Sequence, residues 1–258
     1  MEYQYLTIDR DGHILLIGLN RAQKRNAMHE AMLQELALAY RELHDDPDLR
    51  VGVVYAHGEH FSAGLDLTDI GPKMADGSFD ALAGGIDPWG IRTEPVSKPV
   101  IVALQGYAYT LSIELALAAD IVVAAESTTF AQLEVARGIM PFGGATLRFH
   151  RLGWGNAMRR ILTAEPFDTR EAHRIGLVQE ITPDGEQLAT AIEIAAQIAR
   201  NAPLAVQAAL ASSRDSLIDS ESTRQSLDAT ATKLAATKDA ARAVESYLRG
   251  EPVAFEGD

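Results

Sequence analysis

Cysteine is absent from this chain of 258 residues, and its absence excludes three kinds of chemistry. Without a thiol the protein can form no disulfide, no thiolate metal site and no cysteine nucleophile. Basic residues are also in short supply, since 23 lysines and arginines face 36 aspartates and glutamates for a net charge of −13. Sequence-independent nucleic-acid binding needs a basic surface, so we expect no nucleic-acid partner.

Targeting and membrane signals are missing as well. The N-terminus carries no basic region followed by an apolar stretch, which disfavours export. The longest apolar stretch, residues 99–125, is interrupted by polar side chains and is better explained as strand, helix and strand than as a membrane span. We therefore expect a soluble, cytoplasmic protein that does not associate with a membrane.

The residues that are present follow patterns typical of an α/β protein. Apolar, β-branched runs at 5–9 and 14–19 flank an Asp-Gly pair and indicate a hairpin. Helical spacing over 28–43 and a third strand at 51–56 follow. The order strand, helix, strand recurs within residues 99–125, and this recurrence predicts a spiral of stacked ββα units rather than a doubly wound sheet.

The second half of the chain is predicted to be mostly helical. Residues 70–95 before it hold five glycines and three prolines and indicate a long loop with one short helix. A short strand is expected at 177–181 and a helix near 184–200. We place a boundary at Asn201-Ala202-Pro203, because helical geometry is disfavoured before a proline. Residues 1–200 are then the core, and residues 201–258 are a C-terminal region of three helices that packs on the core or on another subunit.

Two carboxylates in apolar surroundings are the candidates for chemistry. Glu114 interrupts a run of apolar and small residues, and Glu134 follows a strand-like run just before a glycine- and proline-marked turn. A buried carboxylate finds a partner or has its pKa raised, and a raised pKa suits general acid/base work near neutral pH. The residues alone leave alternatives open: Glu114 as a capping or ion-paired helix residue, and Glu134 as an ordinary exposed acid.

The whole chain resembles the crotonase superfamily of enoyl-CoA hydratases and isomerases. The resemblance is carried by LNRAQKRNAM, FSAGLDL, KPVIVALQGYA, the segments around both acids, and TKDAARAVESYLRGEPVAFEG. It implies a ββα spiral core with a C-terminal helical region, assembled as a homotrimer or as a homohexamer that is a dimer of trimers. It also implies an acyl-CoA substrate of fatty acid metabolism, with no metal and no cofactor other than the coenzyme A of the substrate itself.

The resemblance assigns roles to particular residues. The backbone N–H groups of Leu65 and Leu111 match an oxyanion hole for the thioester oxygen, and Leu111 lies at an expected helix N-terminus that favours negative charge. Glu114 matches the acid that activates water for attack at Cβ, and Glu134 matches the acid that delivers a proton to Cα. The positions matched to coenzyme A binding are Arg21, Lys24, Arg25, Ala63, Asp66 and, from the tail, Arg249.

The sequence also departs from the family pattern. Thr110-Leu111-Ser112 stands where many members have three glycines, which permit close ligand approach, and Ala145 stands where a glycine is common. The favoured function is an enoyl-CoA hydratase, a carbon–oxygen lyase. The alternatives are an isomerase or a CoA-thioester or β-diketone hydrolase of the same fold, and a non-catalytic acyl-CoA-binding protein.

Other polar residues receive plainer interpretations. His57 and His60 are attributed to a solvated loop rather than to a metal site. Trp89 and Trp154 are expected to be packing residues. A series of arginines is assigned to helix ends and subunit contacts: Arg148, Arg151, Arg159 and Arg160.

Overall fold

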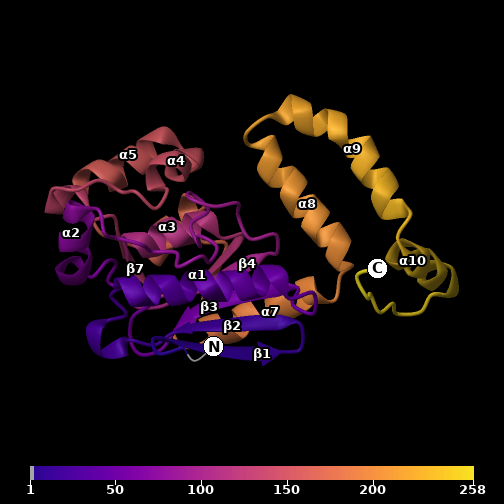
Figure 1. Ribbon diagram of the computed structural model, residues 1–258, viewed down its shortest axis with the longest axis horizontal. Coiled ribbons are helices and arrows are strands. Elements are labelled where there is room, and N and C mark those ends of the chain that lie inside the picture. Colours follow the sequence, from indigo (N-terminus) through magenta and orange to yellow (C-terminus); the bar gives the residue numbers. More distant parts are fainter. Residues whose placement is uncertain (1–2) are drawn as a thin grey trace.

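A six-stranded sheet organises the core in the computed structural model, which describes residues 3–258 (Figure 1). Its strand order is β1-β2-β3-β4-β6-β9. The first pair is antiparallel, as the predicted hairpin requires, and every later pair is parallel. The strands are β1 (Leu6–Asp11), β2 (Ile14–Leu19), β3 (Val51–Ala56), β4 (Val100–Leu104), β6 (Ile121–Ala125) and β9 (Glu180–Thr182).

Both faces of this sheet are buried. Along β4, Val100, Val102 and Leu104 belong to a cluster with helix α1 (Glu30–Asp45). The alternate residues Ile101 and Ala103 pack in a second cluster with helix α7 (Gln187–Ala199). Parallel strands covered by helices on both sides have continuous apolar sequences, which explains why β3 and β4 are apolar throughout.

A second, three-stranded sheet contains β5 (Tyr107–Tyr109), β7 (Thr129–Ala131) and β8 (Phe167–Asp168). Strand β5 follows β4 and β7 follows β6, so the chain twice passes from the large sheet to the small one. Helix α3 (Leu111–Ala118) follows β5 and completes a ββα unit before the chain returns to β6. The expected spiral is confirmed, although the small sheet is not foreseen by the sequence.

The remaining helices of the core lie mostly between these strands. Helix α2 overlaps the beginning of the predicted 70–95 loop and supplies its one short helix, and residues 77–99 after it contain no helix or strand. The remaining helices of the core are the 3-10 turns η1 (Ala22–Lys24), η2 (Val135–Arg137) and η3 (Phe149–Leu152), with α2 (Leu67–Asp76), α4 (Ala145–Arg148), α5 (Trp154–Thr163) and α6 (Thr169–Arg174).

The strand predicted at 177–181 is wrong in its position. Strand β9 begins three residues later, because the N–H groups of Leu177 and Val178 donate to the carbonyl of Ala172 and end helix α6. Both side chains are buried all the same. Their apolar character therefore reflects packing at a helix end rather than strand pairing.

Three C-terminal helices extend away from the sheets in Figure 1: α8 (Pro203–Ser216), α9 (Ser220–Ala235) and α10 (Lys238–Arg249). Helix α1 buries seven side chains, whereas α8 buries none, α9 only Thr223 and α10 only Asp239. Large apolar side chains stay exposed here, including Ile218 at 87% and Tyr247 at 86%. No helix within residues 3–258 has the length and apolar character that crossing a membrane requires.

Two arginines fasten the C-terminal region to the core. Arg50 donates to the carbonyl of Ala199 at 2.9 Å and to the carbonyl of Phe255 at 2.7 Å. Arg214, on α8, forms an ion pair with Asp120 and donates to the carbonyl of Val96. The chain end thus returns to the beginning of α8, as Figure 1 also shows.

Candidate active site

Glu114 lies on helix α3 with its side chain inside the core. It is 1% exposed, and its Oε1 accepts a hydrogen bond of 2.9 Å from the N–H of Ala145. Burial raises the pKa of Glu114, while the N–H groups of Ala145 and Gly143 and the charges of Arg92 and Arg148 oppose that rise. The carboxyl is therefore held in place by the segment that begins α4, which is the capping contact that the sequence left open.

Glu134 follows strand β7 and directly precedes the turn η2. It is 5% exposed, so the alternative of an ordinary exposed acid is wrong. Its Oε1 accepts from the Gln132 side-chain amide at 2.9 Å, and its Oε2 is buried without a partner among residues 3–258. Burial, with the nearby charge of Glu114, raises the pKa of Glu134 to about 7. A carboxyl with that pKa and a free oxygen is suited to proton transfer at neutral pH.

The two backbone N–H groups predicted for an oxyanion hole belong to Leu65 and Leu111, which line the same narrow cavity. Leu65 stands between Gly64, whose carbonyl accepts from Met28, and Asp66, whose N–H donates to Met28. Leu111 is the first residue of α3. Within the described part of the chain, neither the Leu65 nor the Leu111 N–H donates to any acceptor. Such free donors can stabilise a developing oxyanion.

The segments that carry these N–H groups contact each other. Ser62 pairs with strand β5, which ends just before Thr110. A Cβ added at Gly64 would lie 1.9 Å from Thr110 Oγ1, so only glycine fits there. Thr110 itself adopts φ 50° and ψ −110°, a backbone conformation that strains a β-branched residue. At position 110, threonine in place of the glycine that many family members have therefore carries a conformational cost.

Gly143 and Trp89 complete the surroundings of Leu111. A Cβ at Gly143 would lie 2.8 Å from Leu111 Cδ2 and 2.7 Å from Glu114 Oε2, so this glycine leaves room for both side chains. The indole N–H of Trp89 donates to the Leu111 carbonyl at 3.0 Å. Trp89 is buried as predicted, but its hydrogen bond to the candidate oxyanion hole is not foreseen.

A narrow cavity of about 10 Å³, the space that one water molecule needs, adjoins these residues. Apolar side chains dominate its wall, and one arginine reaches it. The residues that bear on the argument are Leu65, Trp89, Arg92, Leu111, Phe142 and Gly143.

The residues matched to coenzyme A lie in two distant places. Arg21 forms a 2.9 Å ion pair with Asp66 and so joins its loop to the start of α2, while Lys24 and Arg25 remain exposed beside it. The N–H of Ala63 donates to the Arg25 carbonyl. Arg249 instead ends α10 and pairs with Glu245, on the opposite side of the molecule from α2 (Figure 1). One chain does not bring Arg249 to the other five residues.

Neither histidine of the candidate metal pair is free. His57 Nε2 lies 2.7 Å from Thr7 Oγ1, and the His60 ring stacks on Tyr107 with 4.0 Å between the ring centres. Across residues 3–258, no three His, Cys, Asp or Glu side chains are grouped so that they could hold a metal ion.

The fold and the pair of buried acids are those of a crotonase-fold enzyme. Comparisons with known proteins identify its family. The profile of the enoyl-CoA hydratase/isomerase family matches residues 9–258. A 2,3-dehydroadipyl-CoA hydratase of Escherichia coli strain K12 is 33% identical over 256 residues, or 98% of each chain. A short-chain-enoyl-CoA hydratase of Clostridium acetobutylicum is 33% identical over 80% of each chain.

Solved structures agree with the sequence relatives. A probable enoyl-CoA hydratase/isomerase from Mycobacterium abscessus is 50% identical over the full length of both chains, with a TM-score of 0.96. An enoyl-CoA hydratase from Mycobacterium tuberculosis H37Rv is 31% identical over 98% of this chain and 99% of that one, with a TM-score of 0.90. This crotonase-fold chain therefore belongs to the enoyl-CoA hydratase/isomerase family of enzymes, as the sequence predicts, and its relatives support hydratase activity in general.

Proposed function

We propose that this protein adds water across the double bond of a 2-enoyl-CoA thioester. The observation that carries the proposal is the pairing of two buried acids, Glu114 and Glu134, beside two unengaged backbone N–H groups. Glu114 accepts a proton from water as its oxygen attacks Cβ. Glu134, with its pKa of about 7, is protonated in part at neutral pH and supplies the proton that Cα receives.

The thioester oxygen carries the negative charge between these two steps. The N–H groups of Leu65 and Leu111 donate to it, and Leu111 adds the favourable field of the α3 N-terminus. In other enzymes the loss of one such donor costs about 3 to 4 kcal/mol in the transition state. The cavity beside Leu111 is narrow, with about 10 Å³ of space, and its wall is mostly apolar.

Coenzyme A binds, in this proposal, along the loop that Arg21 and Asp66 hold together. Lys24 and Arg25 are exposed and meet its phosphates, and Ala63 keeps the loop close through its hydrogen bond to Arg25. Arg249 reaches the nucleotide of a neighbouring subunit, since it lies far from the loop of its own chain. The protein acts in the cytoplasm as a homotrimer or a dimer of trimers, with the bare faces of α8–α10 covered by other subunits. It needs no metal.

The test is the ultraviolet absorbance of crotonyl-CoA, whose conjugated thioester loses absorbance on hydration. We expect decay with the unaltered protein and a loss of about 10²- to 10⁴-fold in rate for Glu134→Gln. Glu165→Gln, which changes an exposed acid outside the site, is the matched control and should keep full activity. No decay with a folded protein that binds coenzyme A would sink the proposal.

The alternatives give different results in the same experiment. An isomerase relocates the double bond without taking up water, a CoA-thioester hydrolase releases the free thiol of coenzyme A, and a β-diketone hydrolase leaves crotonyl-CoA unchanged. A non-catalytic binding protein binds acyl-CoA and turns over none of these substrates. Mass spectrometry of the products in H₂¹⁸O separates these outcomes.

A further inference from the structure

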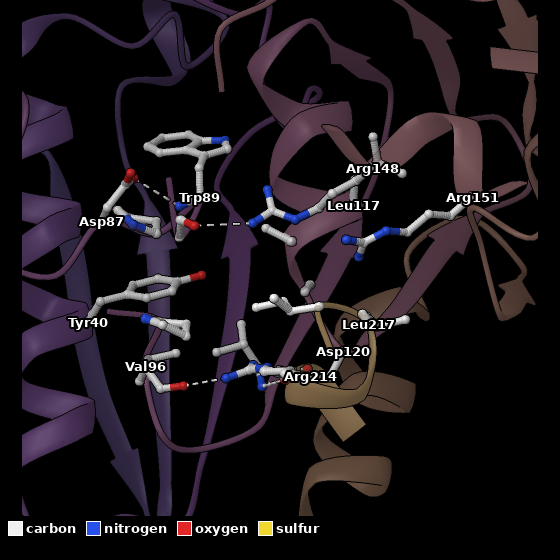
Figure 2. Close-up of a pocket in the computed structure, with 17 residues that line it drawn as sticks. Tyr40, Asp87, Trp89, Val96, Leu117, Asp120, Arg148, Arg151, Arg214 and Leu217 are labelled. Carbon is white, nitrogen blue, oxygen red and sulfur yellow. Dashed lines mark hydrogen bonds and ion pairs between the residues drawn. The ribbon is translucent and has the colours of Figure 1, made fainter. Parts of the chain in front are cut away.

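Figure 2 shows a second, larger cavity of about 300 Å³. Its wall combines the loop at 87–96, the end of α3, the turn η3 and the end of α8. Trp89 and Asp87 line both this cavity and the narrow one at Leu111. Trp89 thus lies between the narrow cavity at Leu111 and the larger space.

The charges in the larger cavity do not balance. Both of its carboxylates are engaged: Asp120 pairs with Arg214 at 3.0 Å, and Asp87 accepts from the backbone N–H groups of Trp89, Ile91 and Arg92. Its other two arginines, Arg148 and Arg151, pair with no carboxylate within residues 3–258. The cavity therefore holds three arginines against two carboxylates, a local excess of positive charge in a chain of net charge −13 that a bound anion would offset.

Arg148 and Arg151 are positioned to bind that anion. Figure 2 shows both guanidinium groups directed into the cavity, with the Tyr40 hydroxyl facing them. Arg148 Nη2 donates to the Gly90 carbonyl at 3.3 Å, whereas Nη1 is buried and has no partner among the described residues. Burial, with the charge of Arg151, lowers the pKa of Arg148. Planar guanidinium groups fit carboxylates in a bidentate manner.

The length of helix α3 gives the distance between the candidate oxyanion hole and the larger cavity. Its first residue, Leu111, offers the N–H for the thioester oxygen, and Leu117 and Ala118 near its end line the larger cavity. At 1.5 Å per residue these points are about 10 Å apart. An extended chain that advances about 1.2 Å per bond covers this distance in roughly eight bonds.

We infer that the larger cavity holds a carboxylate at the far end of the acyl group, which Arg148 and Arg151 bind. The substrate is then the coenzyme A thioester of a dicarboxylic 2-enoic acid of about eight carbons, whose chain passes beside Trp89. This inference rests on the proposed function and specifies its substrate class. Hydration leaves the distal carboxylate unchanged, so the same contacts hold substrate and product.

The test compares affinities for acyl-CoAs that the protein cannot hydrate. Saturated hexanedioyl-CoA and octanedioyl-CoA are titrated calorimetrically against their terminal amides, which match them in shape and lack the charge. We expect the unaltered protein to bind at least one diacid about tenfold or more tightly than its amide. Arg151→Met should remove most of that ratio, because Arg151 is exposed and its substitution leaves the core intact.

Arg170→Met is the matched control, since it removes an exposed arginine outside the cavity and should keep the ratio. Equal affinities for acid and amide overturn the inference, as does a preference that survives Arg151→Met. Crotonyl-CoA hydration is measured on the same preparations. Charge preference without hydration contradicts the proposed function alone, and hydration without charge preference contradicts this inference alone.

Discussion

The segments that carry Glu114 and Glu134 leave the small sheet in the same way and end in different surroundings. Strands β5 and β7 are parallel neighbours, and each acid comes within a few residues of its strand's end. Because adjacent parallel strands end at the same edge of a sheet, the two acids come together there. Glu114 then sits inside a helix with Ala145 as its partner, whereas Glu134 precedes a turn with one oxygen unpaired.

This difference in partners accounts for the difference in proposed roles. Burial raises the pKa of Glu114, but the backbone N–H groups of Ala145 and Gly143 oppose this rise and favour the ionised form that water activation requires. Burial also raises the pKa of Glu134, to about 7, and there the neighbouring charge of Glu114 adds to the rise, against the opposing hydrogen bonds of its own N–H and of Gln132. Two carboxyls of one kind thus become a base and an acid through their neighbours.

The largest effect that separates the two acids is expected in proton exchange. Glu114→Gln should slow crotonyl-CoA hydration by about 10²- to 10⁴-fold. It should not change the rate at which the Cα protons of butyryl-CoA exchange with deuterated water, because Glu134 still transfers the proton at Cα. Glu134→Gln should lose both activities. Proton NMR measures the exchange, and equal exchange rates in the two variants would break the assignment of separate roles.

A smaller effect is expected in the pH dependence of stability. The pKa of Glu134 rises on folding from 4.5 to about 7, so folding favours the protonated form. That stabilisation is fully present below pH 4.5 and is lost as the pH rises through 7. The side chain that Glu134→Gln introduces does not ionise. Between pH 5 and pH 8, the free energy of unfolding of this variant should therefore rise relative to that of the unaltered protein by up to about 3 kcal/mol.

Urea unfolding at several pH values measures this gain. Glu165→Gln, on an exposed acid, should give a curve parallel to that of the unaltered protein. A Glu134→Gln curve that is also parallel would show that the burial of Glu134 does not act on its ionisation.

The smallest effect concerns the strained residue before the Glu114 helix. Glycine relieves the strain of a positive φ, which costs of order 1 to 3 kcal/mol, and gives back part of this in chain entropy. Thr110→Gly should therefore be about 1 kcal/mol more stable than Thr110→Ala, which keeps the strain and removes the buried, unpaired hydroxyl. Thermal unfolding measures the stability of both variants. Equal stability of Thr110→Ala and Thr110→Gly would show that backbone strain at position 110 does not affect the stability of the protein.

Both acids could be predicted from the sequence, but their partners could not. Glu114 stands out because it interrupts an apolar run, and Glu134 because it follows a strand-like run just before a glycine- and proline-marked turn; the same patterning predicts the strands and helices around them. The Ala145 N–H that holds Glu114 comes 31 residues later, and Trp89 lies 22 residues before the Leu111 carbonyl that it binds. Contacts between distant segments leave no periodic signal.

The elements missed by the sequence share a physical reason. Strands β5, β7 and β8 are two or three residues long, which is too short for a period of two to be recognised. Arg148 ends α4 and Arg151 lies in the last turn of η3, as their assignment to helix ends predicts, but their spacing says nothing about the cavity that they line. Part of the wall of that cavity is built by residues 87–96, where no periodic pattern exists.

The two hydrogen bonds of Arg50 close the C-terminal region into a ring that is held to the core at both of its ends. One guanidinium joins the carbonyls of Ala199 and Phe255, so the chain between them begins and ends at the same point. Closing a segment in this way removes many of its conformations, by an amount that grows only logarithmically with its length. The three helices are therefore tethered to the core as one ring, and a displacement of α10 is transmitted to the start of α8.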